Sequence, residues 1–346
     1  MKFYSCDYVQ KFYLKFMDHI SNARIQFCCI GVKGKTLPYV PLHDSPIQTL
    51  DELTELRRNI VNENKISPKD RQYTDTCASC RFYRLDEWNE SDKITDIGLG
   101  MYPAPCQSKC CYCSSAHGEQ RKKFFHFSKA EHGEYYEKIF ETLDYAKKSG
   151  WMSTNVFWKV ASGEISIHPY KDRITKIINM DAAMWHTNCF IYDDNIAANL
   201  IANPKSIVYP SIDCGTPETW QKIRGFDNFA EVKANLVRYS ATALHHNQIY
   251  LKYIILPGLN DNERDFIGFI ELVKSLQATK IEISPDDNKV HSDKNYREKS
   301  VKAAAQLFFM LSINSVSSYI GRFHPDTQSK IVSSVRSIVS SLSQTQ

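Results

Sequence analysis

Four cysteines lie within eight residues and are the side chains of this sequence most suited to chemistry. Cys106, Cys110 and Cys113 are spaced as CxxxCxxC, with Cys111 between them. Three thiolates at these offsets can bind three irons of a four-iron cubane from one short loop. The fourth iron then has no protein ligand, which is the open position that a catalytic metal site keeps. A structural zinc knuckle is the alternative, although zinc favours CxxC pairs and four protein ligands.

Five more cysteines precede this loop, at Cys6, Cys28, Cys29, Cys77 and Cys80. In a reducing compartment such thiols have no stable disulfide role, so their clustering indicates a second metal site.

Ser162, Gly163 and Glu164 follow the next expected strand, one βα unit after the cysteine loop. A glycine lets the backbone approach a ligand closely, and a carboxylate can bind an ammonium group. The triplet is common by itself, but its place after CxxxCxxC makes it informative.

Together these motifs resemble the radical S-adenosylmethionine superfamily, from residue 94 to about residue 284. The resemblance implies that CxxxCxxC holds a 4Fe–4S cluster, whose open iron chelates the amino and carboxylate groups of S-adenosylmethionine. It also implies that Gly163 and Glu164 bind the methionine amino group. Ser162 replaces the first glycine of the family's Gly-Gly-Glu segment, which is a departure from the pattern.

Further cofactor contacts are implied by the same resemblance. Tyr112 would pack near the adenine, Ser211 and Asp213 would contact the ribose and carboxylate, and Ile281 would flank the adenine. Arg224 and Lys252 are possible carboxylate or substrate contacts. Lys252 fits an interior salt bridge equally well.

The segment RIQFCCIGVKGK, followed by Cys77-Ala-Ser-Cys80, resembles the SPASM or twitch region of the same superfamily. The resemblance implies that Cys6, Cys28, Cys77 and Cys80 ligate an auxiliary iron–sulfur cluster, expected to be 4Fe–4S. Cys29 could replace Cys28, because neighbouring strand residues face opposite sides. The family carries this region after the barrel, whereas here it precedes it. A zinc site on the same thiols is the alternative.

The elements that must position these residues alternate regularly from residue 94 onward. We expect strands at 96–101, 156–160, 189–192, 207–212, 249–256 and 280–283, and helices near 128–150, 170–180, 193–202, 217–243, 261–277 and 296–311. Ser128 and Glu131 have the spacing of a capping box. Six βα units with short loops predict an α/β fold, an open partial (β/α)6 TIM-like barrel with its site at the carboxyl ends of the strands.

The expected domains are three. Residues 1–93, with one helix near 49–60, form a small N-terminal metal-stapled domain for the auxiliary cluster. Residues 94–311 form the barrel, and residues 312–346 form a C-terminal helical extension.

Composition excludes several classes of protein. The net charge is only +4 and no basic stripe is visible, so we expect no nucleic-acid partner and no RNA-modifying role. No apolar stretch reaches about 18 residues and no secretory signal is present. A cytoplasmic protein without a membrane partner is expected.

The implied reaction is reductive cleavage of S-adenosylmethionine to a 5′-deoxyadenosyl radical, which abstracts hydrogen from a C–H bond, with the possibility of a net oxidation. A reducing partner such as a flavodoxin or ferredoxin would supply the electron. A carbohydrate-like or other biosynthetic small molecule is the favoured substrate, and a peptide or protein to be matured is the alternative; a non-enzymatic metal-binding scaffold is a further one. Asp286, Asp287 and His291 could contact a hydroxylated substrate, and a plain solvated loop fits them equally well. Cys214 could return a hydrogen atom, although it fits a buried core thiol better.

Overall fold

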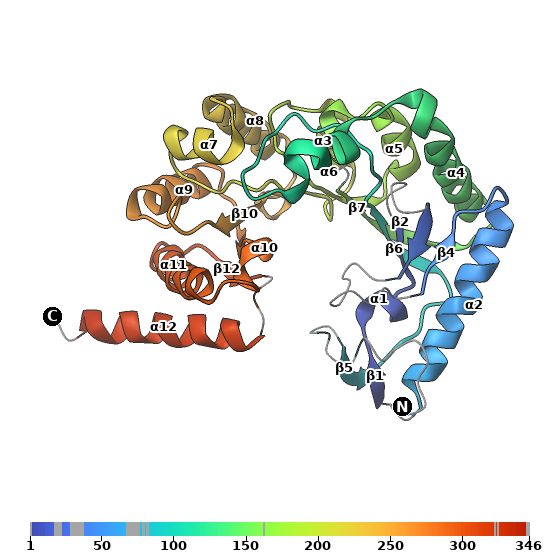
Figure 1. Cartoon of the computed structure of the whole chain (residues 1–346), viewed down its shortest axis with the longest axis horizontal. Helices are drawn as coiled ribbons and strands as arrows, with labels where there is room; N and C mark the ends of the chain where they lie inside the picture. The colour runs from blue at the N-terminus through green and yellow to red at the C-terminus, as the bar shows by residue number, and fades with distance from the viewer. Residues whose placement is uncertain are drawn as a thin grey trace. The chain divides into compact units, whose positions relative to one another are not determined.

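The computed structural model describes residues 2–16, 23–27, 38–66, 77, 80, 83–161, 163–321, 323 and 325–343 (Figure 1). The chain forms two compact units. The first contains Met1–Cys106 and Lys122–Met184, and the second contains Gln107–Arg121 and Trp185–Gln346. The chain therefore passes from one unit to the other at three points: after Cys106, after Arg121 and after Met184.

The first unit contains six neighbouring strands of one sheet, in the order β4-β3-β2-β6-β7-β8, and the sheet continues to β9. β2 pairs in parallel with β6, and β6 pairs in parallel with β7. Three strands from the segment before residue 94, where we expect a metal-stapled domain, join this sheet. The strands are β2 (Tyr13–Phe16), β3 (Arg24–Gln26), β4 (Val40–Pro41), β6 (Ile94–Leu99), β7 (Met152–Val160) and β8 (Ala182–Trp185). A separate antiparallel pair is formed by β1 (Lys2–Ser5) and β5 (Arg84–Glu87).

The helices of the first unit are α1 (Asp7–Gln10), α2 (Pro46–Asn64), α4 (Lys129–Lys148) and α5 (Lys171–Ile178), with a 3-10 turn, η5, at Ile165–Ile167. α2 starts at the expected kind of signal, because the Ser45 hydroxyl accepts a hydrogen bond from the amide of Gln48 and proline follows at the first helical position. The capping box predicted for α4 is wrong. The Ser128 side chain caps nothing, and its amide instead donates to Nδ1 of His132.

In the second unit three strands, β10 (Tyr250–Ile255), β11 (Lys280–Pro285) and β12 (Ser318–Ile320), form a parallel sheet. A short strand, β9 (Ile207–Val208), runs parallel to β10 through isolated bridges of Val208 with Ile249 and of Ser211 with Lys252. Tyr253 packs on Phe266 and Phe269 of the helix that follows. By the alternation of a strand, Lys252 and Ile254 then face the side of the sheet away from that helix.

The helices of the second unit are α6 (Asp194–Ala202), α7 (Pro217–Arg224), α8 (Phe229–Thr242), α9 (Glu263–Ser275), α10 (Asp287–Val290), α11 (Lys294–Ile313) and α12 (Pro325–Ser343). The boundary between the units falls within α3 (Gly118–Phe125). Short 3-10 turns are η4 (Ser114–Ala116) and η6 (His246–Gln248). The single helix predicted over 217–243 is wrong, because α7 ends at Gly225. This glycine has a φ of +77°, the left-handed conformation that terminates a helix.

The strand predicted over 189–192 is also wrong, because the strand lies earlier, at β8. Cys189 has a φ of +57° and lies in a turn. The Thr187 hydroxyl accepts from the amide of Cys189, and the Asn188 side chain accepts from the amide of Phe190. These local bonds compete with strand pairing, so the apolar residues after them do not extend a strand.

The other expected strands and helices are found near their predicted positions, and the chain has a mixed α/β fold with parallel strands. Within the described part of the chain, no helix combines the length and the apolar character needed to cross a bilayer.

Candidate metal and cofactor site

The loop that carries Cys110 and Cys113 is held by the end of α7. The amide of Lys109 donates to the carbonyl of Arg224 at 3.1 Å, and the amide of Cys111 donates to the carbonyl of Ile223 at 2.9 Å. The last carbonyls of a helix have no partner within the helix, so the loop satisfies two groups that would otherwise need water. Cys106 belongs to the first unit, and it is half-buried there.

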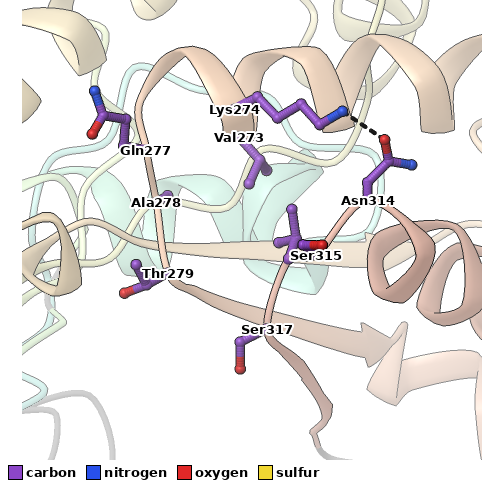
Figure 2. A pocket seen from close by; sticks show the side chains of 9 residues that line it. Val273, Lys274, Gln277, Ala278, Thr279, Asn314, Ser315 and Ser317 are labelled. Atoms are coloured by element: carbon purple, nitrogen blue, oxygen red, sulfur yellow. Dashed lines mark hydrogen bonds between the residues drawn. The ribbon is translucent and has the colours of Figure 1, made fainter.

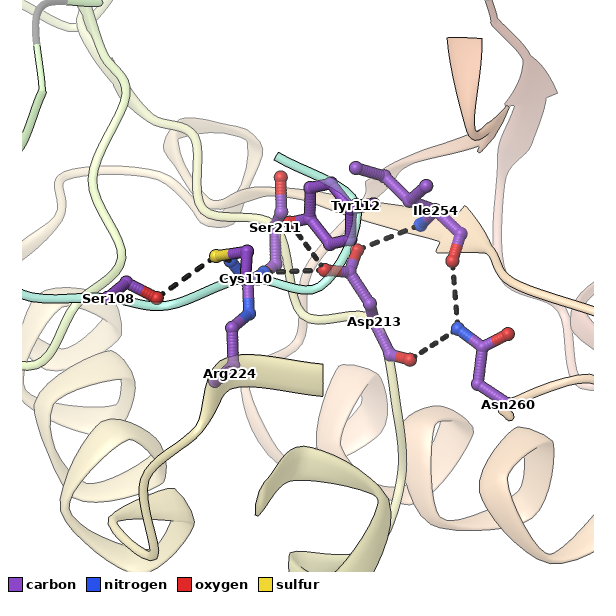
Figure 3. Close-up of polar contacts among 8 residues, drawn as sticks. All are labelled: Ser108, Cys110, Tyr112, Ser211, Asp213, Arg224, Ile254 and Asn260. Carbon is purple, nitrogen blue, oxygen red and sulfur yellow. Dashed lines mark hydrogen bonds and ion pairs between the residues drawn. The ribbon is translucent and has the colours of Figure 1, made fainter. Parts of the chain in front are cut away.

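The sulfur of Cys110 is buried between two polar side chains, which Figure 3 shows. The Ser108 hydroxyl lies 3.0 Å from it, and Nη1 of Arg224 donates to it at 2.9 Å. Cys111 is exposed, whereas Cys113 is half-buried. A guanidinium directed at a buried sulfur suits a thiolate, because a neutral thiol is only a weak acceptor.

The same guanidinium forms a buried ion pair with Asp213. Nη2 of Arg224 lies 2.5 Å from Oδ2 of Asp213, and it also donates to the carbonyl of Ser211. The side chain of Asp213 has no exposed surface, and that of Arg224 is 5% exposed. Burial alone would lower the pKa of Arg224. The facing negative charges, with Cys110 the largest, raise this pKa well above its ordinary value, so the guanidinium stays charged.

Tyr112, from the cysteine loop, also binds to this buried ion pair. Its hydroxyl donates to Oδ2 of Asp213 at 2.9 Å. Burial raises the pKa of Tyr112 well above its ordinary value, which keeps the hydroxyl protonated and able to donate. The other carboxylate oxygen of Asp213 accepts from the amide of Ile254 at 2.9 Å. Of the cofactor contacts predicted from the sequence, the structure therefore brings together Tyr112, Ser211, Asp213 and Arg224, at the carboxyl ends of β9 and β10 (Figure 3).

Asn260 is a positioning residue that the sequence analysis did not identify. Its side-chain amide donates to the carbonyls of Asp213 at 2.6 Å and Ile254 at 2.8 Å, and its oxygen accepts from the amide of Leu256 at 2.7 Å. Asn260 is fully buried, so it joins the ends of two neighbouring strands. The signal available in the sequence was the polar turn LPGLND directly after a buried strand.

In the first unit, Gly163 and Glu164 lie against the residues that precede Cys106. The amide of Glu164 donates to the carbonyl of Pro105 at 2.8 Å. Gly163 has a φ of +53°, and a Cβ placed on it would come within 2.4 Å of the Pro105 carbonyl oxygen and 2.6 Å of that of Ala104. Only glycine fits here without displacing the segment before Cys106, which contains Ala104 and Pro105. Ser162 lies outside the described residues.

The Glu164 carboxylate is buried, with 1% of the residue exposed. Its Oε1 accepts from the amide and the hydroxyl of Ser166, at 3.2 and 2.9 Å. These bonds fix the side chain at the start of η5.

Lys252 forms the interior salt bridge that the sequence analysis kept as an alternative. Its Nζ lies 3.8 Å from Oε1 of Glu282, the residue directly opposite on β11, and both side chains are about one-tenth exposed. Ile281 is fully buried and precedes Glu282, so its side chain faces the other side of the sheet.

The polar segment after β11 is partly used within the protein. Asp286 is buried; its Oδ1 caps α10, and its Oδ2 has no hydrogen-bond partner among the described residues. The side chain of Asn288 donates to the carbonyl of Tyr112 at 2.9 Å, so this segment contacts the cysteine loop. Cys214 is fully buried, and burial raises the pKa of its thiol strongly.

Three of the four thiols proposed for the second site lie among the described residues. Burial raises the pKa of Cys6, and the charge of Cys80 adds a smaller rise to this pKa. Cys77 and Cys80 share a tight turn, in which the amide of Cys80 donates to the carbonyl of Cys77 at 2.8 Å. Cys28 and Cys29 lie outside the described residues.

Within the described ranges, no three Cys, His, Asp or Glu side chains converge closely enough to hold a single metal ion. A cubane makes a different demand, because each thiolate binds its own iron. The donor set of the cysteine loop fits such a cluster: its buried sulfur faces a fixed cation, and the strand-end loop before Cys106 lies against a glycine that admits no side chain.

A cavity of about 310 Å³ lies in the second unit, between the end of α9 and the turn between α11 and β12 (Figure 2). Lys274 and Asn314 line it and are hydrogen-bonded to each other at 2.6 Å. Thr279 and Ser317, which also line it, directly precede β11 and β12. The cavity is therefore at the amino ends of these strands, at the opposite end from Asp286.

No family model matches the chain, and no curated protein matches it. Similar solved structures include SuiB of Streptococcus suis bound to the precursor peptide SuiA, which is 9% identical; the match covers 98% of this chain and 75% of that chain, with a TM-score of 0.49. SuiB bound to S-adenosylmethionine is 10% identical over 80% of this chain and 57% of that chain, with a TM-score of 0.48. This chain thus spans little more than half the length of that SuiB chain. A radical SAM methyltransferase from Sphaerobacter thermophilus is 13% identical over 64% of each chain, with a TM-score of 0.43.

Proposed function

We propose that this chain is a radical S-adenosylmethionine enzyme, with a catalytic 4Fe–4S cluster ligated by Cys106, Cys110 and Cys113. The observation that carries the proposal is the hydrogen bond from Glu164 to Pro105. This bond holds the backbone of Glu164, the residue proposed to bind the methionine amino group, against Pro105, which directly precedes the first cysteine of CxxxCxxC. Three residues separate Cys106 from Cys110, so their Cα atoms are at most about 14 Å apart.

When bound, the cluster and S-adenosylmethionine supply an electron and a 5′-deoxyadenosyl radical that abstracts hydrogen from a substrate carbon. The chain's own residues bind and orient these groups. Glu164 is proposed as the carboxylate for the ammonium group, and Gly163 leaves room for the segment before Cys106. Ser162 is proposed as a cofactor contact from the resemblance alone. Tyr112, Ser211 and Ile281 are proposed to border the adenosine.

Asp213 and Arg224 act in this proposal through the elements that they hold together. Their buried pair ties the end of β9 to the end of α7, and Asn260 fixes the backbone of Asp213. The packing around this pair excludes water from the cysteine sulfur, which protects a reactive radical from side reactions.

A second iron–sulfur cluster is proposed on Cys6, Cys28, Cys77 and Cys80. The tight turn that Cys77 and Cys80 share supports a common site for these two thiols. A fully ligated cluster could accept an electron from the substrate and make the net reaction an oxidation.

For the substrate we propose a hydroxylated small molecule. The buried Oδ2 of Asp286, at the carboxyl end of β11, is an acceptor available for a hydroxyl group. A precursor peptide is the other outcome to be tested. The two are separated by incubating the loaded enzyme, S-adenosylmethionine and a reductant with each substrate class, and by measuring which class increases 5′-deoxyadenosine formation.

The experiment that tests the proposed function is anaerobic reconstitution with iron and sulfide. Wild type is expected to bind about four irons at the first site and to form 5′-deoxyadenosine under reduction. Replacing Cys106, Cys110 or Cys113 with alanine should abolish both. Cys111→Ala is the matched control, because this exposed cysteine lies in the same loop and should be dispensable. Wild-type iron content in the three variants would refute the proposal.

A further inference from the structure

The sulfur of Cys110 is surrounded by polar groups. Two donors reach it, the Ser108 hydroxyl at 3.0 Å and Nη1 of Arg224 at 2.9 Å. When the sulfur is a thiolate, the hydroxyl must be the donor in the Ser108 contact. Both side chains are buried, so water does not compete for these bonds.

The charges around this sulfur oppose each other. Arg224 brings a positive charge into direct contact with Cys110, while Asp213 lies 2.5 Å from the same guanidinium and partly neutralises it. Tyr112 donates to the same oxygen of Asp213 and weakens that neutralisation. The sulfur therefore experiences a positive field whose size depends on Asp213.

We propose that Ser108 and Arg224 are positioning residues that set the reduction potential of the catalytic cluster through the sulfur of Cys110, and that Asp213 opposes them. The inference rests on the proposed function. Reduction adds one electron from an external one-electron reductant and takes the cluster core from the 2+ to the 1+ state, with no bond formed or broken. Hydrogen bonds and positive charge at a ligand sulfur stabilise the state with more negative charge, which raises the potential.

The test is a redox titration of the anaerobically reconstituted full chain, followed by the electron paramagnetic resonance signal of the reduced cluster. Ser108→Ala removes one donor without leaving a charge unpaired, so the potential should become more negative while iron content stays unchanged. Ser300→Ala is the matched control. Ser300 is also a buried serine, but its hydroxyl donates to the carbonyl of Tyr296 within α11.

Asp213→Asn provides a shift of the opposite sign. It removes the charge that neutralises Arg224, so the potential should become less negative. General loosening of the loop would not give opposite shifts in the two variants. Because Asp213→Asn could prevent folding, Ser108→Ala alone is sufficient to decide the inference.

The possible failures are distinguishable. A wild-type protein that binds no 4Fe–4S cluster would remove the proposed function itself. A wild-type protein that binds the cluster, with Ser108→Ala titrating at the wild-type potential, would overturn the inference and leave the proposed function standing.

Discussion

Glu164 is a buried carboxylate, and the amide and hydroxyl of Ser166 donate hydrogen bonds to its Oε1. In the proposed function it binds the methionine amino group. Replacing it by glutamine keeps the size and removes the charge. A hydrogen bond to a charged group contributes about 1.5–3 kcal/mol, so Glu164→Gln should weaken S-adenosylmethionine binding at least about tenfold. The measurement is a titration of the cofactor-induced change in the cluster spectrum. Glu137→Gln, at an exposed position of α4, should bind as wild type does.

Lys252 and Glu282 form an ion pair inside the second unit, and removing one partner leaves the other buried and charged. Lys252→Met should lower the free energy of unfolding by about 3 kcal/mol. Arg264→Ala is the control, because Arg264 and Glu218 are paired at 3.3 Å but 73% and 62% exposed. That change should cost under about 0.5 kcal/mol. Urea denaturation measures both, and equal costs would contradict the assignment of Lys252 as an interior partner.

At the level of residues, motifs were easier to predict than pairings. The sequence analysis placed Tyr112, Ser211, Asp213 and Arg224 near one another from resemblance. It did not predict that Asp213 and Arg224 would form an ion pair with each other, because a buried ion pair depends on how α7 and β9 pack. Asn260 was missed for the same reason, because the sequence of a turn does not indicate which distant backbone groups its asparagine will bind.

Among the loops between elements, Gly163 lies very close to the segment before Cys106. Gly163→Ala should disrupt that segment and reduce iron content, because its Cβ would overlap two carbonyl oxygens. Gly150→Ala is the matched control: Gly150 has a φ of +75° and no atom within 4 Å of the added Cβ. The free energy of unfolding of Gly150→Ala should fall only by the cost of the left-handed conformation, about 1–2 kcal/mol. This variant should keep its iron. Similar iron content in both variants would show that the close approach is unimportant.

Strands and helices were predictable where apolar periodicity was uninterrupted, as in α4, α9 and β10. The two errors both came from short local signals. Thr187 and Asn188 turn the chain before Cys189, and Gly225 divides a helical run that is apolar on both sides. In each case one or two residues outweighed a longer pattern, because their bonds or conformations act on the backbone directly.

For the whole molecule, stability should depend on pH through His168. This side chain is 2% exposed, and burial lowers its pKa to about 4. Its Nδ1 accepts from the amide of Tyr170, while Nε2 contacts the hydroxyl of Tyr136, which donates to the carbonyl of Pro103. A neutral ring with its proton on Nε2 satisfies all of these bonds.

The direction of the pH dependence follows from the protonation of His168 in the folded and the unfolded chain. Above about pH 6.5 the ring is neutral in both the folded and the unfolded chain, so it contributes nothing to the pH dependence. Between pH 6.5 and 4 only the unfolded chain takes up the proton, so the free energy of unfolding should fall by about 3 kcal/mol across this window. Denaturation of wild type and His168→Asn at several pH values measures the difference. His246→Asn, at an exposed position, should keep the wild-type slope; an unchanged slope in His168→Asn would contradict the prediction.

The division of the chain into two units is harder to predict than its elements. A sequence is scanned as contiguous blocks, whereas each unit here is made of two separate segments of chain. The strands from the segment before residue 94 illustrate the difficulty, because β2 finds its partner, β6, about 80 residues later.

The carbonyls at the end of α7 hold the backbone of Lys109 and Cys111 through hydrogen bonds within the protein. A peptide templated in this way pays its ordering entropy when the protein folds, not when the inorganic core arrives. Under the proposed function, this peptide is ordered by folding, so we expect cluster binding not to bear that entropic cost.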